Sequence, residues 1–255
     1  MKMARNVFIT GATSGIGEAI AHAFAQNGDN LILIGRRKER LEAVQAELET
    51  LYQATVWTYQ LDVTKVDMVS DICQKILAEV EVVDILINNA GLALGLEKFQ
   101  DYAVEDMLTM LDTNVKGLLL VTRQILPQMV ERNSGHIINI GSTAGIYAYA
   151  GAAVYSATKA AVKVLSDGMR IDTVDKNIKV TTVQPGLVET NFSEVRFKGD
   201  KQRASEVYQG IQALQATDIA DITLYIANQP QHVQVSDITI MATKQATGFT
   251  IHRES

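Results

Sequence analysis

The sequence predicts an α/β fold, a single domain on a doubly wound, seven-stranded parallel sheet with helices on both faces. Short apolar runs alternate with longer segments of helical periodicity along almost the whole chain. The runs are continuous in Val, Ile and Leu, as in parallel strands buried on both faces. Right-handed crossovers then place ligands at the carboxyl ends of the strands. We predict strands at residues 7–10, 31–35, 56–62, 85–88, 136–141, 179–184 and 238–241.

Length and composition agree with one globular domain. The chain has 255 residues, 47% of them hydrophobic and 20% charged, which is enough for one large core and short for two. It has 3 prolines and no low-complexity tract, so we expect no linker and a single domain at residues 1–255. The net charge of −6 lacks the basic excess of a nucleic-acid binder.

Targeting features point to the cytoplasm. No apolar run is long enough to span a bilayer, and the apolar residues 6–10 are too few for a signal peptide. The single cysteine, Cys73, excludes an internal disulfide and fits a reducing compartment. Because Cys73 lies in a helical segment, a packed thiol is expected rather than a reactive one. We therefore expect a cytoplasmic protein with neither a membrane nor a nucleic acid as partner.

A glycine-rich turn follows the first predicted strand. Gly11, Gly15 and Gly17 lie between this strand and a helix predicted at residues 18–27. Such glycines permit a tight turn and a close approach to a phosphate, which the free N–H groups at the helix start can bind. The alternative is a glycine-rich turn without a ligand. The strand–turn–helix context favours a dinucleotide site.

The end of the second strand distinguishes between two cofactors. NAD-binding units usually carry an acid there for the adenosine ribose, whereas this sequence has Gly35 followed by Arg36 and Arg37. Two guanidinium groups suit a ribose 2′-phosphate, which predicts NADP. The alternative is a solvated basic turn before a helix at residues 39–51. Arginine near a helix start is unfavourable to the helix dipole, which favours a bound anion.

Two polar residues in otherwise regular segments are further candidates. Asp62 ends the third strand and is suited to capping the following helix. Asn114 lies within an apolar helical segment at residues 107–131. An amide is a poor residue for a helix interior, so we expect a local break and a bound water there. A buried structural asparagine is the alternative.

The candidate for catalysis is a tyrosine and a lysine four residues apart. Tyr155 and Lys159 belong to a helix predicted at residues 154–170 and therefore share a face. A neighbouring ammonium lowers the pKa of a phenol, so we expect Tyr155 to exchange a proton near neutral pH. Ser142 follows the strand at residues 136–141, where its hydroxyl could hydrogen-bond a substrate oxygen. Taken alone, a tyrosine and a lysine four residues apart are usually just part of an ordinary helix surface.

Four motifs occur in an order that is typical of one family. The glycine turn has the spacing G-x-x-x-G-x-G, and Asn88-Asn-Ala-Gly91 follows the fourth strand. Tyr155-x-x-x-Lys159 comes next, and Pro185-Gly-Leu-Val-Glu-Thr190 follows the sixth strand. Together these motifs resemble the short-chain dehydrogenase/reductase family. The resemblance implies a Rossmann fold, NADP(H) as cofactor, and the interconversion of an alcohol and a carbonyl.

The resemblance also implies roles for individual residues. The implied catalytic set is Asn114, Ser142, Tyr155 and Lys159. In that set Ser142 and Tyr155 hydrogen-bond the substrate oxygen, Lys159 holds the nicotinamide ribose, and Asn114 links Lys159 to solvent through water. The implied cofactor-binding set is Gly11, Thr13, Ser14, Gly15, Ile16, Gly17, Arg36, Arg37, Asp62, Val63, Asn89, Ala90, Gly91, Tyr155, Lys159, Pro185, Gly186, Val188 and Thr190. Of these, Asp62 and Val63 would flank adenine, and Thr190 would bond the nicotinamide carboxamide.

The segment at about residues 187–212 is the substrate loop by the same resemblance. This loop and the tail at residues 245–253 are similar to those of NADP-dependent 3-hydroxy acid dehydrogenases acting on serine or allo-threonine. The chain lacks two prolines that this subgroup tends to carry, before Asp218 and after Met241, so the substrate range stays open. A general carbonyl or 3-oxoacyl reductase is one alternative. A non-catalytic NADP-binding regulatory protein is the other.

A site for a 3-hydroxy acid needs a cation to bind the substrate carboxylate, which lies beyond the reacting oxygen. This carboxylate lies two carbons away, and Arg196 in the substrate loop is the expected partner because a guanidinium holds a carboxylate through two bonds. The alternative pairs Arg196 with Glu194 or Asp200 on the loop surface. We expect a small-molecule substrate and no metal.

The family resemblance also implies a homotetramer. The predicted helices at residues 107–131 and 154–170 carry more apolar residues than a single stripe facing the sheet requires.

Overall fold

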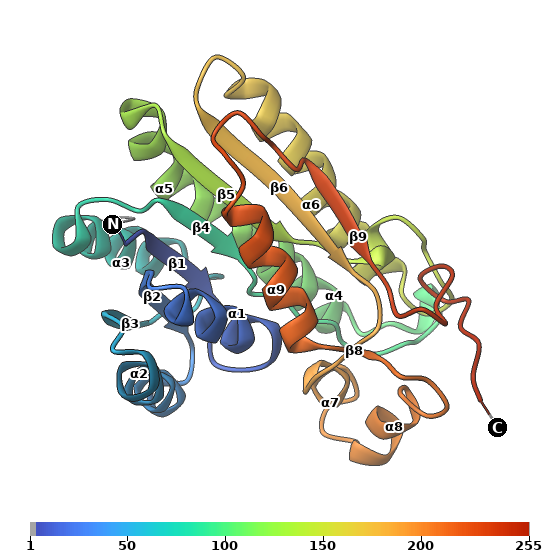
Figure 1. Cartoon of the computed structure of the whole chain (residues 1–255). Helices are drawn as coiled ribbons and strands as arrows, with labels where there is room; N and C mark the ends of the chain where they lie inside the picture. Colours follow the sequence, from blue (N-terminus) through green and yellow to red (C-terminus); the bar gives the residue numbers. More distant parts are fainter. Residues whose placement is uncertain (1–3, 255) are drawn as a thin grey trace.

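A parallel sheet flanked by helices forms the body of the protein in a computed structural model that describes residues 4–254 (Figure 1). Residues 1–3 and 255 of the predicted domain lie outside the described residues. The strands are β1 (Asn6–Thr10), β2 (Asn30–Gly35), β3 (Val56–Gln60), β4 (Ile85–Asn88), β5 (Gly135–Ile140), β6 (Ile178–Pro185), β7 (Val188–Glu189), β8 (Leu214–Gln215) and β9 (Asp237–Ile240). The α-helices are α1 (Gly15–Gln26), α2 (Lys38–Tyr52), α3 (Val66–Val80), α4 (Val104–Leu111), α5 (Gly117–Arg132), α6 (Ala153–Asp172), α7 (Phe192–Arg196), α8 (Lys201–Glu206) and α9 (Ala216–Ala227). Short turns of 3₁₀-helix are η1 (Phe99–Asp101) and η3 (Thr143–Gly145), and η2 (Asp112–Lys116) is a π-helical turn.

The main sheet confirms the predicted topology. Seven strands lie in the order β3-β2-β1-β4-β5-β6-β9, and every neighbouring pair is parallel. The strand order reverses between β1 and β4, so the chain leaves these two strands toward opposite halves of the sheet. Ligands of doubly wound folds bind at the carboxyl ends of the strands beside such a switch point.

Each face of the sheet has its own core. Helices α1, α2 and α9 cover one face and α3 and α5 the other, with α6 behind the sheet against β6 (Figure 1). Val7 and Ile9 belong to the first core and Phe8, between them, to the second. Strands that are buried on both faces need apolar side chains at every position, which explains the continuous apolar runs. Cys73 is buried in the second core, and burial raises its thiol pKa to about 12, as expected of a packed thiol.

The predicted helix at residues 107–131 is interrupted as expected. It divides into α4, the π-helical turn η2 and α5, and Asn114 lies in the turn. The Asn114 Oδ1 atom accepts a hydrogen bond from Leu92 N (2.8 Å), while Nδ2 donates to Leu92 O (2.8 Å) and Thr158 Oγ1 (3.0 Å). The extra residue of the π turn turns this amide toward the segment after β4. Asn114 is therefore also a buried structural asparagine, as the alternative prediction stated.

Other element boundaries differ modestly from the predictions. Helix α1 begins at Gly15 rather than at residue 18, so two of the three motif glycines are helical. Strand β3 ends at Gln60 because Asp62 starts a turn, in which its Oδ1 accepts from Thr64 N (3.0 Å) and Thr64 Oγ1 (2.8 Å). Helix α3 has Lys65 at its N-cap, so the prediction that Asp62 caps this helix is wrong. The side chain is occupied by its own turn.

The segment between β6 and α9 crosses the carboxyl end of the sheet. It contains β7, α7, α8 and β8, and the two strands pair with each other rather than with the main sheet (Figure 1). The C-terminal tail returns to the same region, where Arg253 Nη2 donates to Val207 O (2.9 Å). Residues far apart in the sequence are thereby collected above the ends of β1, β4, β5 and β6.

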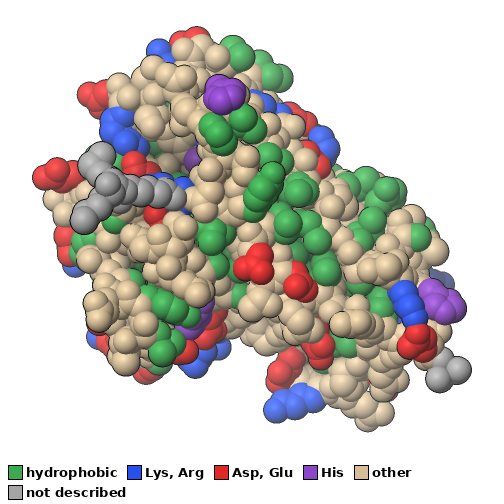
Figure 2. Space-filling view, viewed as in Figure 1, with side chains coloured by type: hydrophobic (Ala, Val, Ile, Leu, Met, Phe, Trp, Pro, Cys, Tyr) green, Lys and Arg blue, Asp and Glu red, His purple; other side chains and the backbone are tan. Residues whose placement is uncertain are grey.

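The surface has apolar side chains outside the two cores. Figure 2 shows hydrophobic side chains gathered over α9 and β9, where Tyr225 is 58% exposed. Leu108 of α4 and Ile171 of α6 are also exposed, at 55% and 71%. None of the helices among residues 4–254 is long and apolar enough to cross a membrane.

Candidate active site

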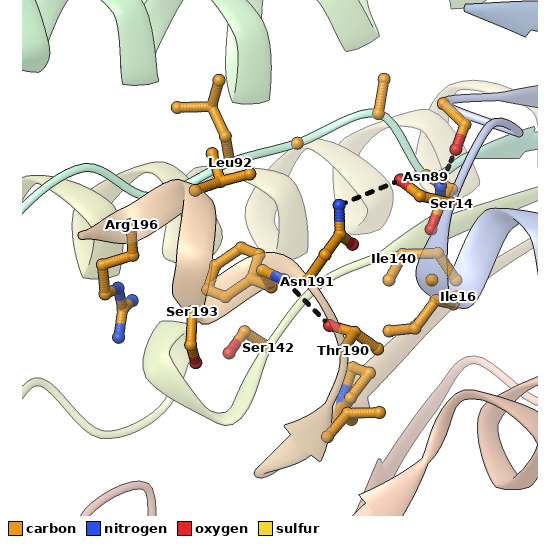
Figure 3. A pocket seen from close by; sticks show the side chains of 18 of the residues that line it. Ser14, Ile16, Asn89, Leu92, Ile140, Ser142, Thr190, Asn191, Ser193 and Arg196 are labelled. Atoms are coloured by element: carbon orange, nitrogen blue, oxygen red, sulfur yellow. Dashed lines mark hydrogen bonds between the residues drawn. The ribbon is translucent and has the colours of Figure 1, made fainter. Parts of the chain in front are cut away.

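A cavity of about 650 Å³ lies at the carboxyl ends of the strands, beside the switch point between β1 and β4. In Figure 3, Ser14, Ile16 and Asn89 lie toward one end and Ser142, Ser193 and Arg196 toward the other. All predicted site residues line the cavity except Gly17 and Asn114. Those that line it are Gly11, Thr13, Ser14, Gly15, Ile16, Arg36, Arg37, Asp62, Val63, Asn89, Ala90, Gly91, Ser142, Tyr155, Lys159, Pro185, Gly186, Val188, Thr190 and Arg196.

The glycine turn is built for close backbone packing. Gly11 and Gly15 have φ angles of +67° and +57°, a backbone conformation that residues other than glycine rarely adopt. At Gly17 a Cβ atom would collide with the Asn89 amide and the Gly11 carbonyl oxygen. The Asn89 amide in turn donates to the carbonyls of Thr10 (3.0 Å) and Gly11 (3.1 Å). Gly17 therefore packs against Asn89 and Gly11 on the side of the turn away from the cavity, and it does not line the cavity as the predicted cofactor contacts would.

The end of β2 leaves no room for an acidic side chain. A Cβ atom at Gly35 would lie 2.8 Å from the Thr13 methyl group. Arg37 Nη2 donates to Thr13 O and Thr13 Oγ1, both at 3.1 Å, so this arginine also supports the glycine turn. The Arg36 guanidinium is exposed and makes no hydrogen bond or ion pair within residues 4–254. The two arginines thus differ, since only Arg36 is wholly free for an anion.

The catalytic candidates meet at the other end of the cavity. Tyr155 and Lys159 lie on one face of α6 and are both largely buried, with exposed fractions of 7% and 6%. The Lys159 ammonium donates to Ile140 O (2.8 Å) and lies 6.0 Å from the centre of the Tyr155 ring. Ser142 follows β5 and its Oγ accepts from Ala144 N (3.1 Å), which fixes the hydroxyl at the start of η3. The predicted shared helix face is confirmed.

Burial opposes the acidity expected for Tyr155. Burial raises its pKa to about 12, although Arg196 and a hydrogen bond with Ser142 both lower it. Burial also lowers the pKa of Lys159 to about 8. The expectation of a tyrosine active near neutral pH considered only the neighbouring ammonium. It missed the removal of both side chains from water, which disfavours their charged forms.

Asn114 lies behind the catalytic candidates and does not line the cavity. Gly91 lies between the polar groups of Asn114 and Lys159, since a Cβ atom added there would lie 3.3 Å from Asn114 Oδ1 and 3.4 Å from Lys159 Nζ. Both N–H groups of the Asn114 amide and one acceptor position of its oxygen are used by Leu92 and Thr158. Its water link to Lys159 stays a prediction.

Arg196 belongs to α7 and lines the cavity, and Figure 3 shows its side chain at the same end as Ser193. Its guanidinium carbon lies 5.1 Å from the Tyr155 ring centre. The surface pairing considered as an alternative is absent within residues 4–254. Glu194 pairs with Lys201 (4.0 Å), and Asp200 accepts from Arg203 N (3.0 Å).

Several cavity residues were missed by the sequence analysis. They are Tyr149, Phe192, Ser193, Tyr208, Gln245 and Gly248. Gln245 Oε1 accepts from Leu187 N (2.8 Å), so the tail holds the segment that follows β6. Ser193 Oγ and Tyr208 OH are hydrogen-bonded at 2.7 Å. Phe192 and Ser193 come shortly after Thr190, with only Asn191 in between, and their place in the loop could have identified them. No local pattern marks Gln245.

Comparisons with known proteins agree with this geometry. A family model described as short chain dehydrogenase matches residues 5–201. A NADP-dependent 3-hydroxy acid dehydrogenase of Salmonella typhi is 47% identical over 249 residues, which cover 97% of this chain and 99% of that protein. A protein of the same description from Schizosaccharomyces pombe is 38% identical, with 98% and 97% covered. The solved closed form of serine dehydrogenase complexed with NADP⁺ has a TM-score of 0.92 and 45% identity, with 98% and 100% covered.

Proposed function

The chain belongs to the short-chain dehydrogenase family, and from that membership we propose that it is an NADP-dependent oxidoreductase acting on 3-hydroxy acids such as serine or allo-threonine. Relatives described as NADP-dependent 3-hydroxy acid dehydrogenases, and a serine dehydrogenase of similar structure, support this substrate class. The observation that carries the proposal is the Arg196 guanidinium, which lies beside Tyr155 without an ion-pair partner among the described residues.

The residues at the phosphate end fit NADP(H). The tight turn at Gly11 and Gly15 and the start of α1 suit a pyrophosphate. The crowded position of Gly35 excludes the acid that would bind an unphosphorylated ribose, and the free Arg36 guanidinium suits a 2′-phosphate. When bound, the nicotinamide supplies the site that accepts or returns the hydride. The other predicted cofactor residues that line the cavity extend from this end toward Tyr155.

The chain's own chemistry is a proton transfer. In oxidation, Tyr155 takes the proton of the substrate hydroxyl as the carbinol carbon loses a hydride, and the alcohol becomes a carbonyl. In reduction the same phenol returns the proton. Ser142 hydrogen-bonds the reacting oxygen and keeps it within reach of Tyr155. Lys159 favours the phenolate by its charge as long as it is protonated, and Asn114 would connect Lys159 to solvent through a water.

Substrate choice follows from the cation beyond Tyr155. A guanidinium can hold a carboxylate through two parallel hydrogen bonds and so orient the carbinol carbon. Phe192, Val195 and Val207 supply apolar walls near Arg196, and Ser193 and Tyr208 supply hydroxyls. Such a site is suited to a small acid rather than to a long acyl chain with no charge near the reacting carbon.

Substrate preference is tested by comparing 3-hydroxypropanoate with its neutral analogue 3-hydroxypropanamide under NADP⁺-linked oxidation. We expect the wild-type kcat/KM to favour the acid. Arg196→Leu should lower the ratio of kcat/KM for acid over amide by about ten- to a hundredfold, because a charged hydrogen-bonded partner is lost. Arg203→Leu is the matched control, since Arg203 stacks on Phe197 and does not line the cavity.

Two outcomes would contradict the proposal. An unchanged ratio in Arg196→Leu, together with good turnover of neutral carbonyls or 3-oxoacyl substrates, would favour a general carbonyl or 3-oxoacyl reductase. NADPH binding without turnover of any member of the panel would favour a regulatory protein.

The assembly is proposed to be a homotetramer. Val104, Leu108 and Leu111 of α4, Val164 and Ile171 of α6, and Tyr225 of α9 are all more than one-third exposed. Apolar surface of this extent on several helices is typical of protein–protein contacts. We expect light scattering at micromolar concentration to give a mass about four times that of the chain. A monomer mass would refute the assembly, and Leu108→Glu should lower the mass without changing the fold measured by circular dichroism.

We also propose that residues 1–255 form one domain with its substrate loop at about residues 187–212. A cytoplasmic location is proposed as well. The buried, unpaired Cys73 supports a reducing compartment.

A further inference from the structure

The Arg196 guanidinium lies next to two aromatic rings that also contact each other. The guanidinium carbon lies 5.1 Å from the centre of the Tyr155 ring and 5.2 Å from that of Phe192. The two rings lie 5.7 Å apart, at an interplanar angle of 55°. Both distances are within the range of a cation–π interaction. The Nε atom is buried and has no hydrogen-bond partner within residues 4–254. This part of the guanidinium is therefore removed from water without a compensating hydrogen bond.

The charged and polar groups that face Tyr155 come from four parts of the fold. Lys159 lies on the same helix, Ser142 at the end of β5, Tyr149 in the segment after η3, and Arg196 on α7. Tyr102, from the segment before α4, faces Arg196, and Glu97 and Asp106 face Tyr102 in turn. After burial, Arg196 is the largest influence on the pKa of Tyr155, which it lowers. No carboxylate among the described residues acts directly on Tyr155.

The two cations near Tyr155 differ in how they respond to pH. Burial lowers the pKa of Lys159 to about 8, so its ammonium loses charge in the alkaline range. An arginine side chain stays charged throughout that range. Tyr155 must lose its proton under the same alkaline conditions before it can accept one from an alcohol. Arg196 is then the permanent positive charge beside the phenolate.

We propose that Arg196 is a positioning residue for the proton transfer as well as the carboxylate partner, so that substrate binding and the ionisation of Tyr155 are linked through one guanidinium. The proposal rests on the proposed function, because it assumes an acidic substrate and Tyr155 as the proton acceptor. The short distance to the Tyr155 ring lets the cation act on the phenol, and the guanidinium has no ion-pair partner within residues 4–254, so it can also bind a carboxylate.

The linkage has a definite sign. Removing the guanidinium removes a charge that favours the phenolate, so the apparent pKa of Tyr155 rises. A bound carboxylate offsets the same charge, so the pKa also rises in the substrate complex. By reciprocity, ionisation of Tyr155 weakens the binding of an acid but not that of its amide. A residue that only shapes the loop would change none of these values.

The test is a set of pH profiles for the full chain at saturating NADP⁺, with 3-hydroxypropanoate and 3-hydroxypropanamide as substrates. Wild type, Arg196→Lys, Arg196→Gln and Arg203→Gln are compared. In the kcat/KM profiles, Arg196→Gln should raise the apparent pKa by about one pH unit, because a unit charge close to the phenol is lost. Arg196→Lys keeps the charge and Arg203→Gln lies outside the cavity, so both should stay near the wild-type pKa.

A second comparison uses the wild type alone. The apparent pKa in kcat should be higher for the acid than for the amide, because only the acid offsets the guanidinium in the complex. This difference should become smaller in Arg196→Gln, because the carboxylate is no longer held close to the phenol. Coincident pKa values for wild type and Arg196→Gln would overturn the inference, even if the variant lost activity equally at every pH. Failure of the proposed function looks different, since the wild type would then not prefer the acid.

Discussion

Replacing Tyr155 by Phe is expected to lower kcat by about two to four orders of magnitude, the usual contribution of a positioned acid or base. The ring keeps its contacts with Phe192 and Arg196, so only the hydroxyl that transfers the proton is lost. Because the ring stays in place, NADPH binding should stay within about threefold of wild type. Steady-state rates in both directions, with NADPH binding followed by its fluorescence, measure the two effects.

The control for this variant removes a hydroxyl elsewhere. Tyr52 is hydrogen-bonded to His22 (3.4 Å), away from the cavity, and Tyr52→Phe should keep wild-type kcat. If Tyr155→Phe kept wild-type kcat as well, the assignment of the proton-transfer residue would be wrong. If instead it bound NADPH poorly, the loss of rate would have to be attributed to the cofactor site.

Replacing both Arg36 and Arg37 by Gln is expected to weaken NADP⁺ binding by about a hundredfold or more, and NAD⁺ binding far less. Each charged hydrogen bond to a phosphate contributes about 1.5–3 kcal/mol. The single variants should differ. Arg36→Gln should affect NADP⁺ alone, whereas Arg37→Gln should weaken both cofactors because Arg37 also bonds Thr13 in the glycine turn.

Calorimetric titration of each variant with the two cofactors measures this difference. Lys38→Gln is the control, because Lys38 is the next basic residue, pairs with Glu42 (3.7 Å) and does not line the cavity. Equal losses for NADP⁺ and NAD⁺ in Arg36→Gln would mean that this guanidinium does not bind the 2′-phosphate.

The fold was predictable because its evidence is local. Seven apolar runs were sufficient for the seven strands of the main sheet, and observed boundaries lie within two residues of the predicted ones. The break at Asn114 was also predictable, because an amide disfavours the interior of an apolar helix. The short strands β7 and β8 were not predicted, because two-residue strands leave no periodicity to detect.

The site was predictable where residue spacing determines geometry. Tyr155 and Lys159 had to share a face because they lie four apart on one helix, and Gly11 and Gly15 lie at the turn because the turn needs them. Gly17 could not be distinguished from them in sequence. Only its contact with Asn89, a residue from the other half of the fold, makes it a packing residue.

By itself the sequence determined the sheet, the glycine turn, and the tyrosine and lysine on one helix face, because each depends on neighbours within a few residues. Tertiary structure alone decided that Arg196 lies next to both Tyr155 and Phe192, and that Gln245 of the tail holds the segment after β6. It also decided that burial raises the pKa of Tyr155 to about 12. Burial, ring contacts and electrostatic effects on a pKa depend on which residues, remote in sequence, come into contact in the fold, and no local spacing encodes them.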